Sequence, residues 1–261
     1  MWKSVVRVSS EDVCSGTALV VDRTPTHLYL LTNLHLWVDA TFTDHLSADF
    51  KNEIKRYQRL HPKLKTSGRK REGGDVRRKS PRKSAKKTPV VSDKPQVVVE
   101  QLVPDVLELN EVHRFSLDSD VCWRSSAAFD FAIFEVAAPR DIDLVRCKTS
   151  IAVFATMGVH VFGFPGALQD QKFDHPYAII PAEVTGWSGN QMTLSSLSAP
   201  GLSGSAIVCT KRGVPVGYIG GGFDGGKNAQ YQSYGFTFHG IPPDLPSSLP
   251  PVTDDETKDE L

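Results

Sequence analysis

The chain has 261 residues, of which 40% are hydrophobic and 23% charged, and its formal net charge is zero. This composition is typical of a folded globular protein. No apolar run approaches the roughly 18 residues that a membrane-spanning helix needs, and the N-terminus lacks the apolar core of a signal peptide. Four scattered cysteines without metal-ligand spacing argue against a disulfide scaffold or a cysteine metal site.

Short runs rich in β-branched and aromatic residues, bounded by Gly, Pro, Asp or Asn, predict strands along most of the chain. Eleven such runs occur, at residues 4–8, 16–21, 28–32, 96–103, 129–136, 151–155, 159–164, 191–197, 205–209, 216–221 and 234–238. One stretch with helical periodicity lies at 48–60. Many short strands and no other helical pattern favour an all-β barrel or sandwich.

Charge is distributed unevenly between two parts of the chain. Residues 51–94 hold 17 Lys and Arg but only 4 Asp and Glu, a net charge of +13, so the remainder carries −13. The block has few apolar residues to bury, which predicts a disordered basic insertion at about 51–94. Residues 241–261 hold five prolines and six acidic residues, and we expect this Pro-rich acidic tail to be extended and unpacked.

Three residues form a candidate catalytic set. His35 follows the predicted strand 28–32, and Asp130 interrupts an otherwise apolar strand. A lone carboxylate is costly to bury, so Asp130 needs a partner. Ser203 lies between two glycines, Gly201 and Gly204, in "PGLSGSAI". A serine nucleophile requires a histidine base and a carboxylate that orients the imidazole. His35, Asp130 and Ser203 can supply these three groups.

The order of these residues resembles that of the trypsin/chymotrypsin-like serine peptidases. The motifs "CSGTALVV" and "LLTNLH", then "DFAIF", then "GLSGSAIV" carry the resemblance, which covers roughly residues 1–35 and 97–240. The sequence "SGS" that begins at Ser203, in place of "SGG", is more similar to HtrA-like and bacterial glutamyl endopeptidase-like members than to secreted trypsins. The resemblance implies an all-β chain with two six-stranded-type antiparallel β-barrels.

The resemblance also divides the chain into domains and implies residue roles. An N-terminal barrel over 1–145 would carry His35 and Asp130, and a second barrel over 146–240 would carry Ser203. Ser203 would attack a peptide carbonyl, His35 would move the proton, and Asp130 would orient His35. Backbone N–H groups of Gly201 and Ser203 would form the oxyanion hole. The implied activity is that of a serine endopeptidase acting on polypeptides, with no cofactor and no metal.

A substrate pocket follows from the same resemblance. Leu197, six residues before Ser203, would form its floor. Its walls would be the glycines Gly220, Gly221, Gly222 and Gly235. An apolar floor and walls without side chains predict a medium or large apolar residue before the scissile bond.

The alternative function is a catalytically inactive trypsin-like domain that binds protein or nucleic acid. The basic segment 69–87 has three interpretations: a phosphate-binding arm for nucleic acid, a signal for an import receptor, or a solvated linker. No membrane partner is expected. Without a signal peptide we expect an intracellular location, cytoplasm or nucleus, while the C-terminal "KDEL" makes the endoplasmic reticulum the alternative.

Overall fold

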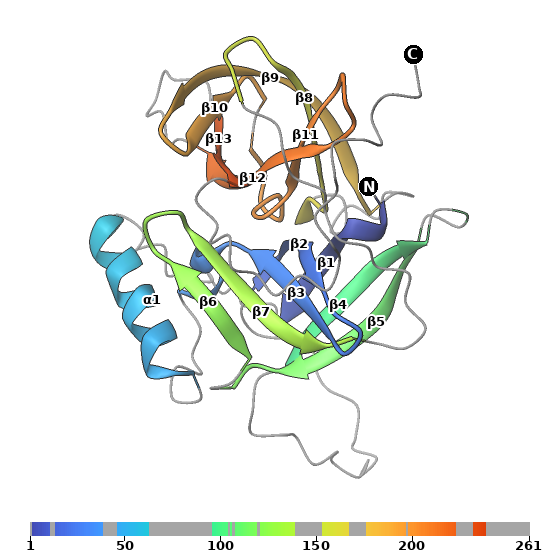
Figure 1. The fold of residues 1–261 in the computed structure, drawn as a ribbon, viewed down its shortest axis with the longest axis vertical. Helices are drawn as coiled ribbons and strands as arrows, with labels where there is room; N and C mark the ends of the chain where they lie inside the picture. The colour runs from blue at the N-terminus through green and yellow to red at the C-terminus, as the bar shows by residue number, and fades with distance from the viewer. Residues whose placement is uncertain are drawn as a thin grey trace, which may run out of the picture.

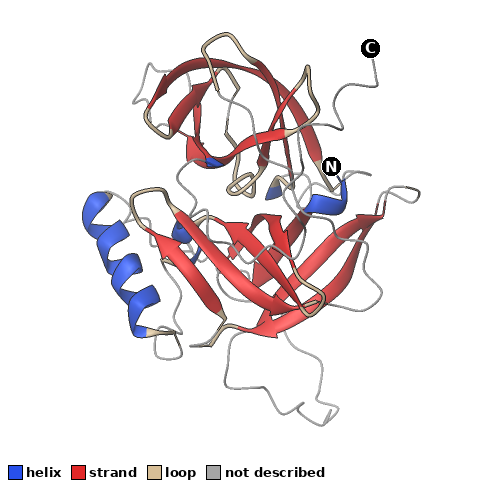
Figure 2. Cartoon of the chain, in the orientation of Figure 1, coloured by secondary structure: helices blue, strands red, loops and turns tan. Residues whose placement is uncertain are grey.

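The computed structural model of the protein describes most of the chain outside its basic and acidic segments. The described residues are 2–10, 14–38, 46–62, 96–103, 105, 108–118, 121–138, 153–166, 176–196, 198–222 and 232–238. Strands dominate these residues and form two groups, one above the other in Figures 1 and 2. The basic segment 69–87, the tail 241–261 and the predicted domain boundary at 145–146 lie outside them.

The N-terminal group is a seven-stranded antiparallel sheet. Its strands are β1 (Val5–Ser10), β2 (Cys14–Arg23), β3 (His27–Thr32), β4 (Gln96–Val103), β5 (Glu108–Ser116), β6 (Cys122–Ser126) and β7 (Phe131–Ala137). They are hydrogen-bonded in the order β5-β4-β1-β2-β3-β7-β6. Apolar residues of β1 to β3 are buried, as their β-branched and leucine-rich sequences predict.

The C-terminal group is a closed barrel. It contains β8 (Gly158–Gly163), β9 (Ala178–Ser188), β10 (Gln191–Leu194), β11 (Ala206–Cys209), β12 (Pro215–Gly222) and β13 (Ser233–Thr237), in the order β10-β13-β12-β11-β8-β9. The predicted all-β class with two antiparallel β-structures is therefore confirmed. The described residues of the N-terminal half form seven strands, where the resemblance implied six, and residues 153–155 of the predicted strand 151–155 are not in a strand.

The helix α1 (Ala48–Leu60) follows the first three strands and packs beside β6 (Figure 1). Its helical periodicity predicts these bounds. The Ser47 side chain caps it by accepting from the backbone N–H of Phe50 (3.2 Å). Phe50, Ile54 and Tyr57 are buried, and the Glu53 carboxylate accepts from the backbone N–H of Ala127 (2.6 Å). The prediction that an unstructured insertion begins at 51 is therefore wrong for residues 51–60, because an apolar face anchors them.

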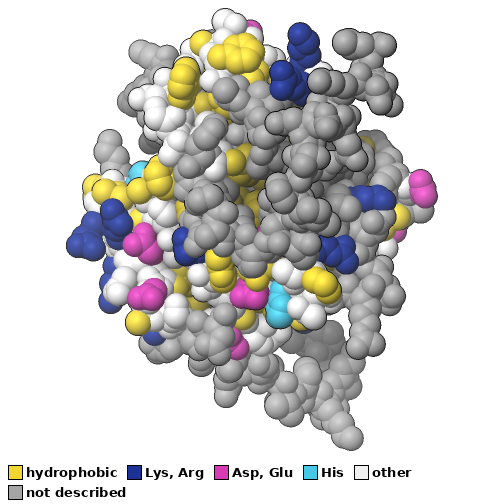
Figure 3. Space-filling view, viewed as in Figure 1, with side chains coloured by type: hydrophobic (Ala, Val, Ile, Leu, Met, Phe, Trp, Pro, Cys, Tyr) yellow, Lys and Arg dark blue, Asp and Glu magenta, His cyan; other side chains and the backbone are white. Residues whose placement is uncertain are grey.

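The outward face of α1 is basic. Lys55, Arg56 and Arg59 are exposed, and Figure 3 shows Lys and Arg side chains gathered over this helix. Among the described residues, no helix is long and apolar enough to cross a membrane.

An apolar cluster joins the two strand groups. Leu19 and Phe131 of the N-terminal sheet pack with Phe162 and Tyr218 of the barrel, and all four are at most 3% exposed. The Tyr218 hydroxyl donates to the backbone carbonyl of Phe129 across this contact (2.7 Å). Burying each large apolar side chain stabilises the fold by roughly 1.5–3 kcal/mol. The seam between the two groups is thus a packed core, which fixes residues on one side relative to residues on the other.

Candidate active site

His35 is positioned by the end of strand β3. It lies in the short 3-10 turn η2 (Leu34–Trp37), whose Leu34 and Trp37 are buried. The preceding Asn33 is fully buried, and its amide nitrogen donates to both the backbone carbonyl (2.9 Å) and the carboxylate (3.2 Å) of Asp130. Asn33 therefore ties the segment that carries His35 to the turn before β7.

Asp130 is buried at that turn, 2% exposed, with a φ of 48°. Its Oδ1 accepts from the backbone N–H of His35 (2.9 Å), and its Oδ2 accepts from Nδ1 of the same residue (2.7 Å). With the Asn33 amide, three N–H groups donate to one carboxylate. These bonds offset the cost of removing the charge from water.

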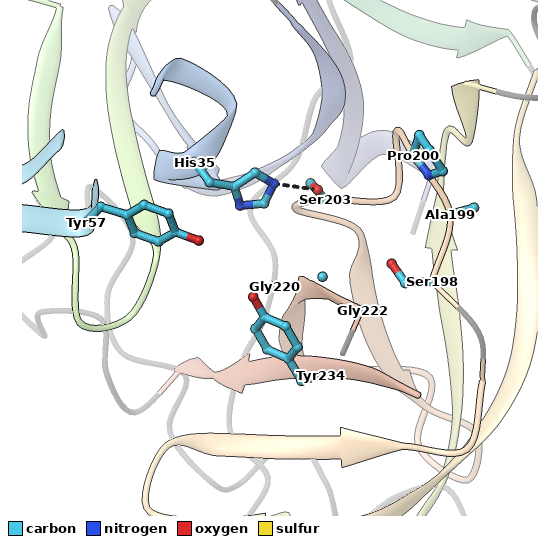
Figure 4. Close-up of a pocket in the computed structure, with 10 residues that line it drawn as sticks. His35, Tyr57, Ser198, Ala199, Pro200, Ser203, Gly220, Gly222 and Tyr234 are labelled. Atoms are coloured by element: carbon cyan, nitrogen blue, oxygen red, sulfur yellow. Dashed lines mark hydrogen bonds between the residues drawn. The ribbon is translucent and has the colours of Figure 1, made fainter. Parts of the chain in front are cut away.

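Ser203 reaches His35 from the other strand group. Its Oγ lies 2.8 Å from Nε2 of His35 (Figure 4). An ionised Asp130 can only accept, which puts the imidazole proton on Nδ1 and leaves Nε2 to accept from the serine hydroxyl. The structure thus brings together the three residues that the sequence motifs selected. Along the chain, His35 is 95 residues from Asp130 and 168 residues from Ser203.

The pKa of His35 is the result of opposing influences. Burial lowers it, because desolvation penalises the imidazolium. The charge of Asp130 and the hydrogen bond to it both raise the pKa, and together they outweigh the effect of burial. The pKa of His35 therefore lies above its ordinary value. The pair is therefore arranged to stabilise a proton arriving on His35.

The backbone around Ser203 is bent by two glycines with positive φ. Gly201 has φ 90° and Gly204 has φ 82°, conformations that residues with a Cβ rarely adopt. The carbonyl of Pro200 accepts from the N–H of Gly166 (2.8 Å), so the N–H of Gly201, in the same trans peptide group, points the opposite way. Within the described part of the chain, the N–H groups of Gly201 and Ser203 have no acceptor. Both donors are available to a ligand.

Gly204 is expected to be irreplaceable. A Cβ there would overlap the backbone carbonyl of Thr17 and impose strain at φ 82°. We expect Gly204→Ala to lower the free energy of unfolding by about 3 kcal/mol, measured by urea denaturation. Gly213→Ala is the matched control, since Gly213 has φ 64° but no atom within 4 Å of its added Cβ; it should cost only about 1 kcal/mol. Equal losses would contradict the steric argument.

A cavity of about 320 Å³ opens beside His35 and Ser203. Its lining is His35, Tyr57, Ser198, Ala199, Pro200, Ser203, Gly220, Gly221, Gly222 and Tyr234 (Figure 4). Three predicted wall residues, Gly220 to Gly222, are among them. Gly235 is not, and its prediction as a wall residue is wrong: its missing side chain faces Ile207 in the barrel core. Leu197, the predicted floor, lies outside the described residues.

Two tyrosines of this cavity were not selected from the sequence. Tyr57 comes from α1, and its ring centroid is 6.3 Å from that of His35. Tyr234 comes from β13, and its ring lies against Gly220 and Gly221, where added Cβ atoms would meet it. Burial and the nearby Asp130 charge raise the pKa of Tyr57 above its ordinary range and that of Tyr234 to about 12. Both side chains are therefore neutral at physiological pH. The sequence pattern of α1 indicates only that Tyr57 is buried.

The described residues contain no group of three or more His, Cys, Asp or Glu side chains that could hold a metal ion.

No protein-family model matches the chain, and neither does any curated protein sequence. Solved structures do match its fold. The protease domain of MamO from Magnetospirillum magneticum is 11% identical, with 91% of this chain and 93% of that chain covered and a TM-score of 0.50. Deg5 is 11% identical, with coverages of 92% and 85%, and a Glu endopeptidase is 14% identical, with coverages of 90% and 85%; both have a TM-score of 0.50.

These likenesses define the fold. The chain has the double β-structure of the trypsin-like serine proteases, and the resemblance that the three motifs indicated is confirmed at this level.

Proposed function

We propose that the protein is a serine endopeptidase that hydrolyses peptide bonds through an acyl-enzyme. The observation that carries this proposal is the continuous relay of hydrogen bonds from Ser203 Oγ to His35 Nε2 (2.8 Å) and from His35 Nδ1 to Asp130 Oδ2 (2.7 Å). Distances of this order allow proton transfer in an active relay. The trypsin-like fold supports a polypeptide as the substrate.

In the first half-reaction Ser203 Oγ forms a bond to the carbonyl carbon of the substrate, and its proton passes to Nε2 of His35. Asp130 stabilises the resulting imidazolium through the bond to Nδ1. The C–N bond then breaks, and His35 returns the proton to the leaving amine. In the second half-reaction water attacks the ester, its proton passes to His35 and returns to Ser203, and the carboxylic acid leaves.

The negative oxygen that forms in each half-reaction needs donors. The N–H groups of Gly201 and Ser203 are proposed for this role, supported by the positive φ of Gly201 and by the absence of acceptors for both groups among the described residues. Because such donors are held in place before the reaction, they stabilise developing charge without reorganisation.

A fluorophosphonate probe tests the proposal directly, because it phosphonylates only an activated serine. We expect stoichiometric labelling of the full chain, with the adduct located on Ser203 by peptide mass spectrometry. Denatured protein is the control and should take no label. A folded protein that stays unlabelled would favour the inactive binding module. Any role of segment 69–87 in binding nucleic acid or an import receptor is a separate proposal, since that segment is outside the described residues.

A further inference from the structure

The part of the cavity beyond Ser203 is narrow. On one side run Ser198, Ala199 and Pro200, and on the other Gly220 to Gly222 (Figure 4). A Cβ added to Gly222 would lie 3.1 Å from Cβ of Ser198 and 3.8 Å from its Oγ. Carbon atoms in contact prefer separations of about 3.5–4.0 Å. Along this direction the gap between Gly222 and Ser198 is therefore a few tenths of an ångström short of the room that one methylene group needs.

Buried hydrogen bonds hold these walls together. Ser233, the register partner of Gly222 on β13, donates its backbone N–H to the carbonyl of Ser196, two residues before Ser198 (2.9 Å). The Ser233 hydroxyl also lies 2.9 Å from both the Ser196 carbonyl and the Ser196 hydroxyl. Ser196 is 7% exposed and Ser233 1%. Separating the walls to admit a large side chain would break these bonds and leave buried polar groups unpaired.

Resting on the proposed function, we propose that this recess selects a small side chain, that of alanine or serine, in the residue directly before the scissile bond. The residues that limit its size are Ser198 and Gly222. The expectation from the sequence was a medium or large apolar residue, because glycine walls leave room in an otherwise fixed pocket. In the folded chain the absence of a side chain at Gly222 lets the two segments approach so closely that an added Cβ would lie only 3.1 Å from that of Ser198.

Hydrolysis of matched peptides tests this selection. The peptides differ only in the residue before the scissile bond, which is Ala, Val, Phe or Lys. We expect kcat/KM for Ala to exceed that for Phe and Lys by at least about 100-fold and that for Val by about tenfold. A rate for Phe or Lys equal to or above that for Ala would overturn the proposal.

Ser198→Gly removes the Cβ that faces Gly222. We expect this variant to raise the Val-to-Ala ratio of kcat/KM by about tenfold, the range of one to two methylene groups. Ser188→Gly, at the exposed end of β9, is the matched control and should leave the ratio at the wild-type value. An unchanged ratio in Ser198→Gly would show that the contact with Gly222 does not set the size limit.

A binding measurement separates this proposal from the proposed function. Product-like peptides ending in Ala or Phe are titrated into the Ser203→Ala variant and followed by NMR. At least about tenfold tighter binding of the Ala peptide supports the narrow recess, even if wild type takes no fluorophosphonate label and the proposed proteolysis fails. If the Phe peptide binds as tightly as the Ala peptide or more tightly, or if neither peptide binds, the proposal of a narrow recess is overturned. This holds even if the wild-type protein is labelled by the fluorophosphonate.

Discussion

Replacing Ser203 with alanine is expected to lower kcat for peptide hydrolysis by a factor of roughly 10⁶. The variant keeps the cavity and the backbone donors but lacks the oxygen that lies 2.8 Å from His35 Nε2. No covalent intermediate can form, and the remaining catalysis comes from binding and charge stabilisation alone. The loss is measured by steady-state hydrolysis of the peptide that has Ala directly before the scissile bond, together with fluorophosphonate labelling.

Ser188→Ala is the matched control for this experiment, since it removes a hydroxyl from the exposed end of β9. It should retain wild-type kcat and labelling. A Ser203→Ala variant that is folded by circular dichroism and still hydrolyses the peptide at the control rate would remove Ser203 from the mechanism.

Asp130→Asn is expected to lower kcat by a factor of about 10⁴. Asparagine has nearly the shape of the carboxylate, so the packing of the buried turn is preserved. Its amide is neutral, however, and cannot stabilise an imidazolium at His35. If the amide nitrogen faces Nδ1 it donates there, which puts the imidazole proton on Nε2 and removes the acceptor for Ser203. Loss of kcat with KM changed by less than about threefold is the expected pattern.

The pH profile gives this variant a second readout. His35 must be neutral to accept the serine proton, so wild-type kcat/KM should fall as the pH is lowered through the pKa of His35. Burial lowers that pKa, but Asp130 raises it above its ordinary value of about 6.5. In Asp130→Asn only the effect of burial remains, and the acidic midpoint should move to lower pH. A midpoint that does not move would contradict the role assigned to Asp130.

The residues of the relay could be selected from the sequence because each stands in a recognisable local context. His35 follows a buried strand, Asp130 interrupts an apolar run, and Ser203 lies between two glycines, Gly201 and Gly204, that permit a tight bend. The sequence also indicates helix α1, since Phe50, Ile54 and Tyr57 recur at the spacing of a buried helical face, but the high charge of residues 51–94 favours an unstructured segment over most of the same residues.

Other features have no such local signal. Strands β5 and β6 are exposed or half-buried for most of their length and carry many polar residues, so they lack the apolar runs on which strand prediction depends. Strand β9 is more apolar, but it contains Pro181 and Gly186, two residue types that argue against a strand. The helical pattern indicates that Tyr57 is buried, but it does not indicate which residues surround the side chain. Gly235 looks like Gly220 in sequence, yet it faces the barrel core while Gly220 lines the cavity.

From its sequence alone, this protein is predictable as a β-rich chain with one helix, a charged segment without a core, and a histidine, an aspartate and a serine in the order of the trypsin-like peptidases. Those properties depend on local composition and spacing, which the chain carries in any conformation. Only the tertiary structure decided that Asp130 receives three N–H donors, that Tyr57 borders the cavity, and that Ser198 lies close to Gly222. These are contacts between segments far apart in the chain, and their distances arise only when both strand groups pack on a shared apolar seam.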